Sequence, residues 1–118
     1  MPKTRSVART PEDVSRLFVE YANARDAEGM TELYEPDAVV AYPPGQITTG
    51  RAAILELYKK FVANAPQMKV EEPLTTLQCG DLALTSTRPT DNAGARAQVV
   101  RRQPDGRWLR VLDRPEFR

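Results

Sequence analysis

The stretch ARAQVVRRQPDGRWLRVLD, residues 95–113, is the part of the chain that says most about its fold. Two runs that suit strands, residues 95–103 and 108–113, flank Pro104-Asp105-Gly106, and an Asp-Gly pair favours a tight hairpin. The preceding residues have the same character. Strand-like runs are found at residues 68–77 and 82–88, and turns are expected at residues 79–81 and 89–94. The second half of the chain is therefore predicted to be a β-meander.

The first half of the chain has a helical period instead. Thr10-Pro11-Glu12-Asp13 is typical of a helix start, because Thr10 can cap it, Pro11 suits the first position and the carboxylates face the positive end of the dipole. Apolar residues then recur at offsets of three and four up to Arg25-Asp26. We expect a second short helical segment over residues 27–34, stopped by Pro36, and a short strand over residues 38–42.

A third helix is predicted after Thr49-Gly50-Arg51, and Asn64-Ala65-Pro66 would end it. Its expected buried face consists of Ile54, Leu57, Tyr58, Phe61 and Val62. Three helices in the first half followed by antiparallel strands indicate an α+β fold. We expect a cone-like curved antiparallel β-sheet of about four to six strands, packed against the three helices and enclosing a pocket. One domain is expected over residues 1–118, with residues 1–9 flexible.

The composition of the chain excludes or disfavours several classes of function. The chain has 17 Lys and Arg against 16 Asp and Glu, a net charge of +1, which favours neither nucleic acid nor an anionic membrane surface. No run approaches the roughly 20 apolar residues of a membrane span, so we expect a cytoplasmic protein. Cys79 is the one cysteine and histidine is absent, which excludes the usual His/Cys zinc sites. No nucleotide-binding loop is present, and we expect no metal and no cofactor.

The arrangement resembles the nuclear-transport-factor-2-like (NTF2-like) superfamily, and most strongly its uncharacterised SnoaL-like and ketosteroid-isomerase-homologue branch. The resemblance rests on four stretches: residues 26–28, residues 33–40, the helix entry at residues 49–54 and the ending at residues 101–108. It implies a cone whose concave sheet face and first helix enclose a mostly apolar cavity for a small hydrophobic molecule. It also implies a homodimer through the outer sheet face.

Residues of the ketosteroid isomerases do not carry over. Tyr42 stands where their Asp base would be, Phe18 where the first-helix Tyr would be, and Gln98 where the protonated acid would be. Steroid isomerisation by that mechanism is therefore not expected.

Two other branches of the superfamily resemble the chain in part. The limonene epoxide hydrolases resemble it through Arg96-Ala97-Gln98, Asp113 and Tyr42, but Gln98 replaces a carboxylate and cannot take a proton. The SnoaL-like cyclases use a late-strand Asp as the acid/base, and Asp113 fits that role.

Strand alternation gives an independent test of which side chains converge, because every second residue shares a face. If Gln98 faces inward, so does Arg96. On the last strand we place Leu109 and Asp113 in the pocket and Trp108 on the outer face, as a candidate dimer anchor. Alternatively, Asp113 caps the strand end or pairs with a nearby Arg: Arg96, Arg110 or Arg114.

Two hypotheses remain. The first is a cofactor-free isomerase, cyclase or epoxide-hydrolase-like enzyme that uses Asp113 as acid/base on a hydrophobic carbonyl or epoxide substrate. The second is a non-catalytic ligand-binding or dimeric scaffold protein. In both, the expected binding residues are Tyr42, Gln98, Arg96, Phe18, Leu109 and Tyr58. No nucleic acid or membrane is expected as a partner.

Overall fold

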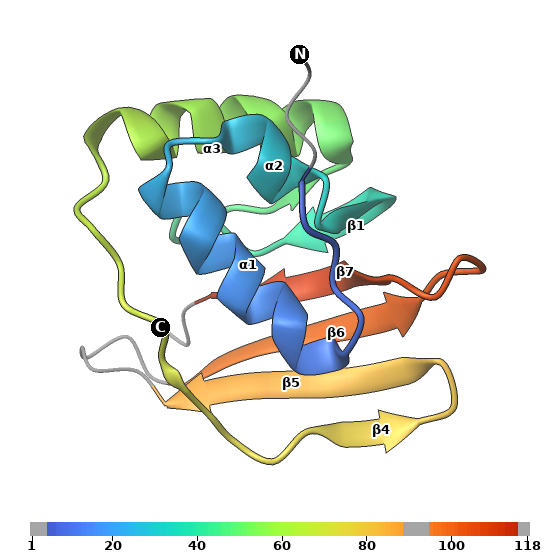
Figure 1. Cartoon of the computed structure of the whole chain (residues 1–118). Helices are drawn as coiled ribbons and strands as arrows, with labels where there is room; N and C mark the ends of the chain where they lie inside the picture. The colour runs from blue at the N-terminus through green and yellow to red at the C-terminus, as the bar shows by residue number, and fades with distance from the viewer. Residues whose placement is uncertain (1–4, 89–94, 116–118) are drawn as a thin grey trace.

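The computed structural model describes residues 5–88 and 95–115. In these residues three helices cover one face of a curled, open sheet of seven strands (Figure 1). The helices are α1 (Pro11–Asn23), α2 (Ala27–Thr31) and α3 (Arg51–Asn64). The strands are β1 (Tyr34–Val40), β2 (Thr48–Thr49), β3 (Glu72–Pro73), β4 (Leu77–Cys79), β5 (Leu82–Arg88), β6 (Arg96–Arg102) and β7 (Trp108–Arg114).

The start of α1 is the predicted one. Thr10 Oγ1 accepts from the backbone N–H of Asp13, and the Asp13 carboxylate accepts from the Thr10 N–H, which completes a capping box. The helix then buries one face, with Val14 and Leu17 almost fully inaccessible. That face packs on β5 and β7, so α1 lies across the inner side of the sheet (Figure 1).

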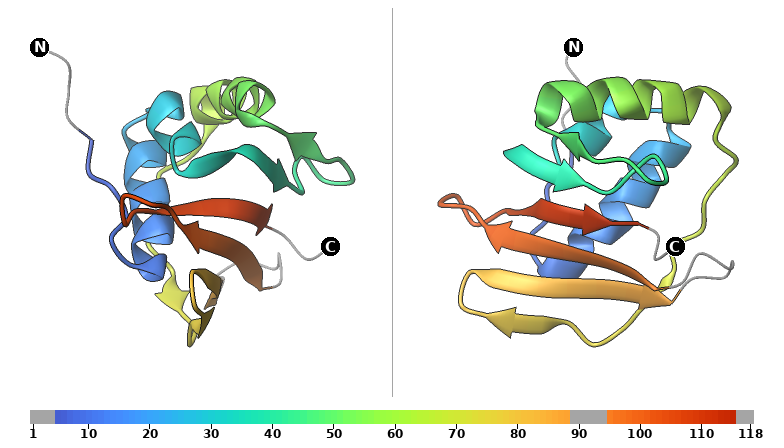
Figure 2. Two further views of the ribbon diagram at one scale, coloured as in Figure 1. Left: turned by 90° about the vertical axis from the view of Figure 1, so that its right-hand side faces the viewer. Right: turned by 180° about the vertical axis from the view of Figure 1, so that it is seen from behind.

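The helix α3 also begins where predicted. Gly50 precedes it with a φ of 89°, a conformation that side chains with a Cβ rarely adopt, which explains why a glycine stands at this entry. Ile54, Tyr58 and Val62 are buried and pack the helix toward β1 and β2. The two views in Figure 2 show α3 along the β1 side of the curled sheet.

The strand order is β2-β1-β7-β6-β5-β3, with β4 also paired to β5. Strands β5, β6 and β7 form the predicted meander, but β1 pairs with β7 in parallel. The predicted α+β architecture is therefore confirmed, with a mixed sheet in place of an antiparallel one. The reason is long-range: α3 and the meander separate β1 from β7, and no hairpin sets their direction.

Element boundaries differ from the expected ones at two places. The strand predicted over residues 68–77 is replaced by the two short strands β3 and β4. The strand β1 begins at Tyr34 and ends at Val40, whereas the sequence predicted a strand over residues 38–42. Tyr34 was expected at the end of a helix, but α2 stops at Thr31. The residue before Tyr34 already bonds to β7, because the backbone N–H of Arg110 donates to Leu33 O at 2.7 Å. Pairing with β7 therefore extends the strand upstream through Pro36. The turn predicted at residues 89–94 lies outside the described residues.

A β-bulge interrupts β7. Val99 pairs with Leu112, but the next residue, Val100, pairs with Arg110, which leaves Val111 as an extra residue in β7. The alternation of faces therefore shifts by one position at Val111. As a result, the side chains of Arg110 and Asp113 both face the helices. In a regular strand, two residues that are three positions apart would lie on opposite faces.

The predicted outer-face position of Trp108 was wrong. The residue is 3% exposed and belongs to the main hydrophobic core, and its backbone N–H bonds to Ala8 O at 3.0 Å. Regular alternation counted back from an inward Asp113 puts Trp108 outside. Because the bulge shifts the alternation, Trp108, Arg110 and Asp113 all face inward.

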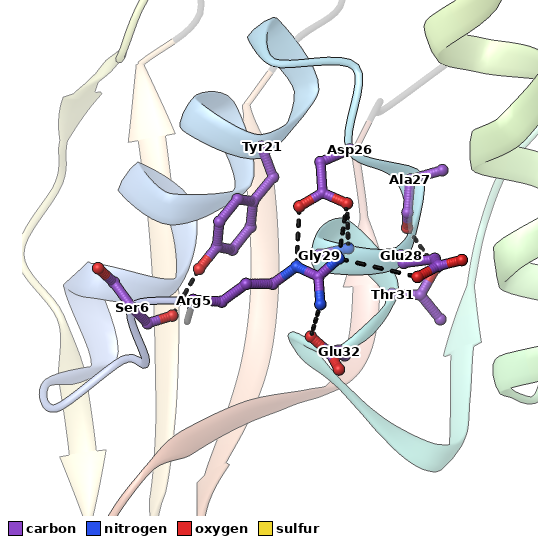
Figure 3. A network of polar contacts seen from close by, with 9 residues as sticks. All are labelled: Arg5, Ser6, Tyr21, Asp26, Ala27, Glu28, Gly29, Thr31 and Glu32. Atoms are coloured by element: carbon purple, nitrogen blue, oxygen red, sulfur yellow. Dashed lines mark hydrogen bonds and ion pairs between the residues drawn. The ribbon is translucent and has the colours of Figure 1, made fainter. Parts of the chain in front are cut away.

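The part of the N-terminal segment that the structure describes packs against α1 and α2. Arg5 forms a two-point ion pair with Asp26, with Nε–Oδ2 at 2.8 Å and Nη2–Oδ1 at 3.0 Å, and a further bond to Glu32 (Figure 3). Tyr21 donates its hydroxyl proton to Ser6 O at 2.5 Å (Figure 3). Residues 5–8 thus close one end of the molecule, and residues 1–4 lie outside the described part.

Candidate functional site

A buried polar cluster lies between the sheet and the helices. It consists of Tyr34 (β1), Tyr58 (α3), Arg110 and Asp113 (β7). The Tyr34 hydroxyl donates to Asp113 Oδ2 at 2.5 Å, and it lies 2.7 Å from the Tyr58 hydroxyl. Because the Tyr34 proton is directed at Asp113, Tyr58 is the donor to Tyr34. Three elements far apart in sequence therefore form one hydrogen-bond chain that ends on the carboxylate.

Arg110 is the cation of this cluster. Its Nη1 lies 3.0 Å from the Tyr34 hydroxyl and 3.3 Å from Asp113 Oδ2, and its Nη2 donates to Ser15 Oγ at 3.2 Å. The guanidinium carbon lies 4.6 Å from the centre of the Phe18 ring. Such stacking stabilises a cation away from water, so Phe18 helps to hold Arg110 in place.

The two oxygens of Asp113 have different environments. The Asp113 side chain is 1% exposed. Oδ2 accepts from Tyr34 and Arg110, whereas the buried Oδ1 has no hydrogen-bond partner among the described residues. A buried acceptor without a partner is costly and is usually satisfied by water or a ligand. Asp113 therefore presents one oxygen that is held and one that is available.

Gln98 continues this polar surface along the sheet. It pairs in register with Asp113 on one side and with Thr85 on the other, and all three side chains are buried. Thr85 Oγ1 donates to Gln98 Oε1 at 3.0 Å. This bond fixes the oxygen end of the amide on the β5 side.

Burial and neighbouring charge keep the hydroxyl groups protonated. Burial raises the pKa of Tyr34 well above its ordinary value, and the negative charge of Asp113 raises it further. The same two causes raise the pKa of Tyr58. Burial alone would lower the pKa of Arg110, but Tyr34 and Asp113 outweigh it, so the net shift is upward. The cluster therefore contains two tyrosine donors and a permanent cation.

Three of the residues predicted for the site are not members of this polar cluster. Arg96 instead binds Glu71, with Nε–Oε1 at 3.0 Å, and Pro115 O, with Nη1–O at 2.6 Å. Tyr42 follows β1 and contacts Phe61 edge-on, with ring centres 6.4 Å apart. Leu109 is buried, but it borders a cavity under the N-terminal segment.

The other predicted residues converge. Gln98 lies beside Asp113, Tyr58 donates into the hydrogen-bond chain, and Phe18 stacks on Arg110. Sequence reasoning did not place Tyr34 in the site. It named Arg110 only as one of three arginines that could pair with Asp113, and the structure shows that pair at 3.3 Å. The helical period predicts Tyr34 as a core residue of a helix, and no sequence signal marks the bulge that turns Arg110 inward.

Two cavities border other parts of the molecule. One, of about 290 Å³, lies under residues 5–8 and is lined also by Tyr21, Trp108 and Leu109. The other, of about 270 Å³, lies on the outer side of the sheet, and its lining includes Val39, Ile47, Leu84, Val99 and Leu112, together with Gln98 and Asp113. Neither is lined by Tyr34, Tyr58 or Arg110.

Within the described residues, no group of three or more Asp, Glu, Cys or His side chains is arranged to hold a metal ion. In the same part of the chain, no helix is both long and apolar enough to cross a membrane.

Comparison with known families now places the chain. The family model described as SnoaL-like domain matches residues 15–115. The chain belongs to the SnoaL-like family. Members of this family fall within the NTF2-like superfamily, as the sequence resemblance predicted. No curated protein matches the chain.

Solved structures similar to this SnoaL-like chain support the fold. A candidate calcium/calmodulin-dependent protein kinase type II association domain from Thiobacillus denitrificans has a TM-score of 0.73 at 21% identity, covering 96% of this chain and 100% of that one. A ketosteroid isomerase-like protein from Erwinia carotovora has a TM-score of 0.70 at 16% identity, covering 87% of this chain and 89% of that one. An NTF2-like protein with a cystatin-like fold from Novosphingobium aromaticivorans has a TM-score of 0.63 at 22% identity, covering 87% of this chain and 76% of that one.

Proposed function

We propose that this SnoaL-like protein is a cofactor-free enzyme that transfers a proton on a neutral, hydrophobic carbonyl compound, with Asp113 as the general base. One observation carries the proposal. Asp113 is a buried carboxylate whose Oδ2 is held by Tyr34 and Arg110, while Oδ1 has no partner in the described residues. A base needs an oriented lone pair that faces the proton it removes.

The two carboxylate oxygens of Asp113 have different roles in this mechanism. Tyr34 and Arg110 fix the plane of the carboxylate through Oδ2, so Oδ1 is oriented before a ligand binds. Oδ1 would then remove a proton from the carbon next to a carbonyl group. Tyr58 supports Tyr34 by donating to its hydroxyl. Arg110 supplies the counter-charge to the buried carboxylate of Asp113.

The neighbouring residues favour a carbonyl substrate over an epoxide. Epoxide opening of the limonene epoxide hydrolase type uses a second carboxylate beside the first. Gln98 occupies the in-register position next to Asp113, and an amide cannot accept a proton. Asp113 would therefore act alone. A single base suffices to move a proton next to a carbonyl.

Hydrogen–deuterium exchange tests the proposal. The protein is incubated in D₂O with a panel of small cyclic ketones and enones, and loss of the proton next to the carbonyl is followed by NMR. We expect exchange with the wild type and loss of it in Asp113→Asn. Asp81→Asn, at an exposed turn, serves as the matched control and should retain the activity.

Two outcomes would reject the base. One is equal exchange by wild type and Asp113→Asn. The other is saturable ketone binding without any exchange, which would favour the second candidate, a non-catalytic ligand-binding protein.

We also propose that the outer face of the sheet joins two copies of the chain. A row of apolar residues crosses five neighbouring strands in register: Val39, Leu112, Val99, Leu84 and Leu77. Leu112, Leu84 and Leu77 are 49%, 41% and 62% exposed. At the spacing of adjacent strands the row is roughly 19 Å long, which suits the apolar centre of a standard interface. Trp108, which is buried, has no part in it.

A further inference from the structure

Residues 5–8 pass over a cavity at one end of the molecule. They belong to neither a helix nor a strand, and together with residues of α1, α2 and the start of β7 they line a space of about 290 Å³. Trp108, the first residue of β7, is part of this lining. A segment above unfilled space makes fewer packing contacts than one that lies on a filled core, so it lifts at a lower cost in free energy.

Arg5 fastens the segment to both ends of α2. Its Nε and Nη2 bond to the two carboxylate oxygens of Asp26 at 2.8 and 3.0 Å, and its Nη1 bonds to Glu32 at 3.1 Å (Figure 3). A two-point pair of this kind is stronger and more exacting in geometry than a single hydrogen bond. The side chains of Arg5 and Asp26 are 28% and 24% exposed, so salt ions reach the pair and weaken it.

The other contacts that hold the segment are weaker. Ser6 O accepts a hydrogen bond from the Tyr21 hydroxyl at 2.5 Å, and Ala8 O accepts one from the Trp108 N–H at 3.0 Å. Among residues 5–8 only Ala8 is buried, and its side chain is a single methyl group, so lifting the segment exposes little apolar surface of its own. The ion pairs at its outer end are therefore the main attachment.

We propose that residues 5–8 are a strap that opens and closes this cavity, with Arg5 as its fastener. The hinge lies directly after Ala8, because the Arg9 N–H bonds to the Asp13 carboxylate at 2.9 Å and is fixed to α1. The structure shows the closed state. In the open state Arg5 is released from its carboxylates, and small neutral molecules reach the cavity. None of the described residues that line the cavity belongs to the buried polar cluster, so the strap goes beyond the proposed function.

Two backbone amides of β7 report on the strap. The Trp108 N–H donates to Ala8 O on the strap, whereas the Arg110 N–H donates to Leu33 O, which lies outside it. Opening of the strap alone frees the first amide and leaves the second bonded. Amide hydrogen exchange followed by NMR detects such local openings residue by residue. We expect the protection factor of Trp108 to be about tenfold or more below that of Arg110.

Removing the fastener should make the strap open more often. Arg5→Gln should lower the protection factor of Trp108 by roughly threefold to tenfold and leave that of Arg110 unchanged. Arg88→Gln is the matched control, because it breaks an exposed ion pair with Glu72 and should change neither amide. In the wild type, raising NaCl from about 0.05 M to about 1 M should act like Arg5→Gln, and salt should add little to that variant.

Thiol labelling tests access to the cavity itself. Ala8→Cys places a thiol at a lining position that is 1% exposed in the closed state, and Cys79→Ser removes the exposed native thiol. A neutral aromatic disulfide such as 4,4′-dithiodipyridine should then react only while the strap is open. Adding Arg5→Gln should raise the labelling rate by the same factor by which it speeds exchange at Trp108.

Four results would overturn the strap. The first is equal protection of Trp108 and Arg110 in the wild type, which would show that the segment lifts only when the sheet opens. The second is an equal effect of Arg5→Gln on both amides, which would show general destabilisation. The third is a labelling rate of Ala8→Cys that Arg5→Gln does not change. The fourth is unchanged protection of Trp108 at high salt, and this arm uses the wild type, so it decides even where Arg5→Gln does not fold.

Discussion

The Tyr34 hydroxyl lies 2.5 Å from Asp113 Oδ2, although the two residues are 79 positions apart in the chain. The contact exists because β1 pairs in parallel with β7, which brings the first strand next to the last. Arg110, which lies on the other side of the bulge at Val111, donates a hydrogen bond to the same oxygen. The candidate site is therefore a consequence of strand pairing and of one inserted residue.

Replacing Tyr34 with Phe should destabilise the protein by roughly 1–3 kcal/mol, because Asp113, Tyr58 and Arg110 all lose a buried partner. Urea unfolding measures the change. Tyr42→Phe is the matched control, since no described residue bonds to the Tyr42 hydroxyl, and it should change stability by less than about 0.5 kcal/mol. Equal losses in the two variants would contradict the assigned network.

Replacing Arg110 with Met should cost roughly 3–5 kcal/mol, because it leaves the Asp113 carboxylate buried without its cation. Adding Asp113→Asn to that variant removes the uncompensated charge and should recover part of the loss. A double-mutant cycle by urea unfolding measures the coupling, expected at roughly 0.5–3 kcal/mol. Strictly additive effects would show that the two side chains do not interact.

Acid should expose the contribution of Asp13. Burial alone would raise its pKa, but hydrogen bonds from the Arg9 and Thr10 N–H groups and from Arg16 lower it below the usual 3.8. A carboxyl with a lowered folded-state pKa stabilises the protein above its unfolded pKa, and this stability is lost as pH falls through the folded value. Asp13→Asn should therefore lose stability relative to wild type at pH 7, and much less at pH 3.

Unfolding midpoints in urea at the two pH values give this comparison. Thr10→Ala removes the other half of the capping box without a titrating group, and it should cost about 1 kcal/mol at both pH values. A constant difference between Asp13→Asn and wild type across this range would refute the linkage.

Introducing a charge into the outer apolar row should separate the proposed dimer. Leu112→Arg places a cation within the row, between Val39 and Val99, where it would be buried without a partner on association. Light scattering at micromolar concentration should give a dimer for the wild type and a monomer for the variant. Val70→Arg, at a 58% exposed apolar residue off the sheet, should remain dimeric. A monomeric wild type would reject the interface.

Features that depend on neighbouring residues were predictable. The Thr10 cap, the glycine entry of α3 with its buried Ile54, and the hairpin at Pro104-Asp105-Gly106 all follow from residues within a few positions of each other. Asp113 was also expected on the inner face, where the structure places it. Its pairing with Gln98 was not predictable, because the hairpin register alone pairs Gln98 with Leu112 and the bulge shifts the pairing by one residue.

The members of the site that were missed, or left open as in the case of Arg110, depend on distant contacts. Tyr34 belongs to a strand only because β7 pairs with it, and without that partner its neighbours resemble the end of a helix. Arg110 and Trp108 face inward because Val111 is bulged out of the ladder, and a bulge has no fixed sequence pattern.

Local sequence signals were enough for the helices and the meander, since caps, turns and apolar periods act over a few residues. The strand pairing of Asp113 and its surroundings depend on how the whole chain packs. Parallel pairing of β1 with β7 brings Tyr34 to it, and the bulge brings Arg110. Both depend on the free energy of packing the whole sheet against α1 and α3, to which residues from every part of the chain contribute at once.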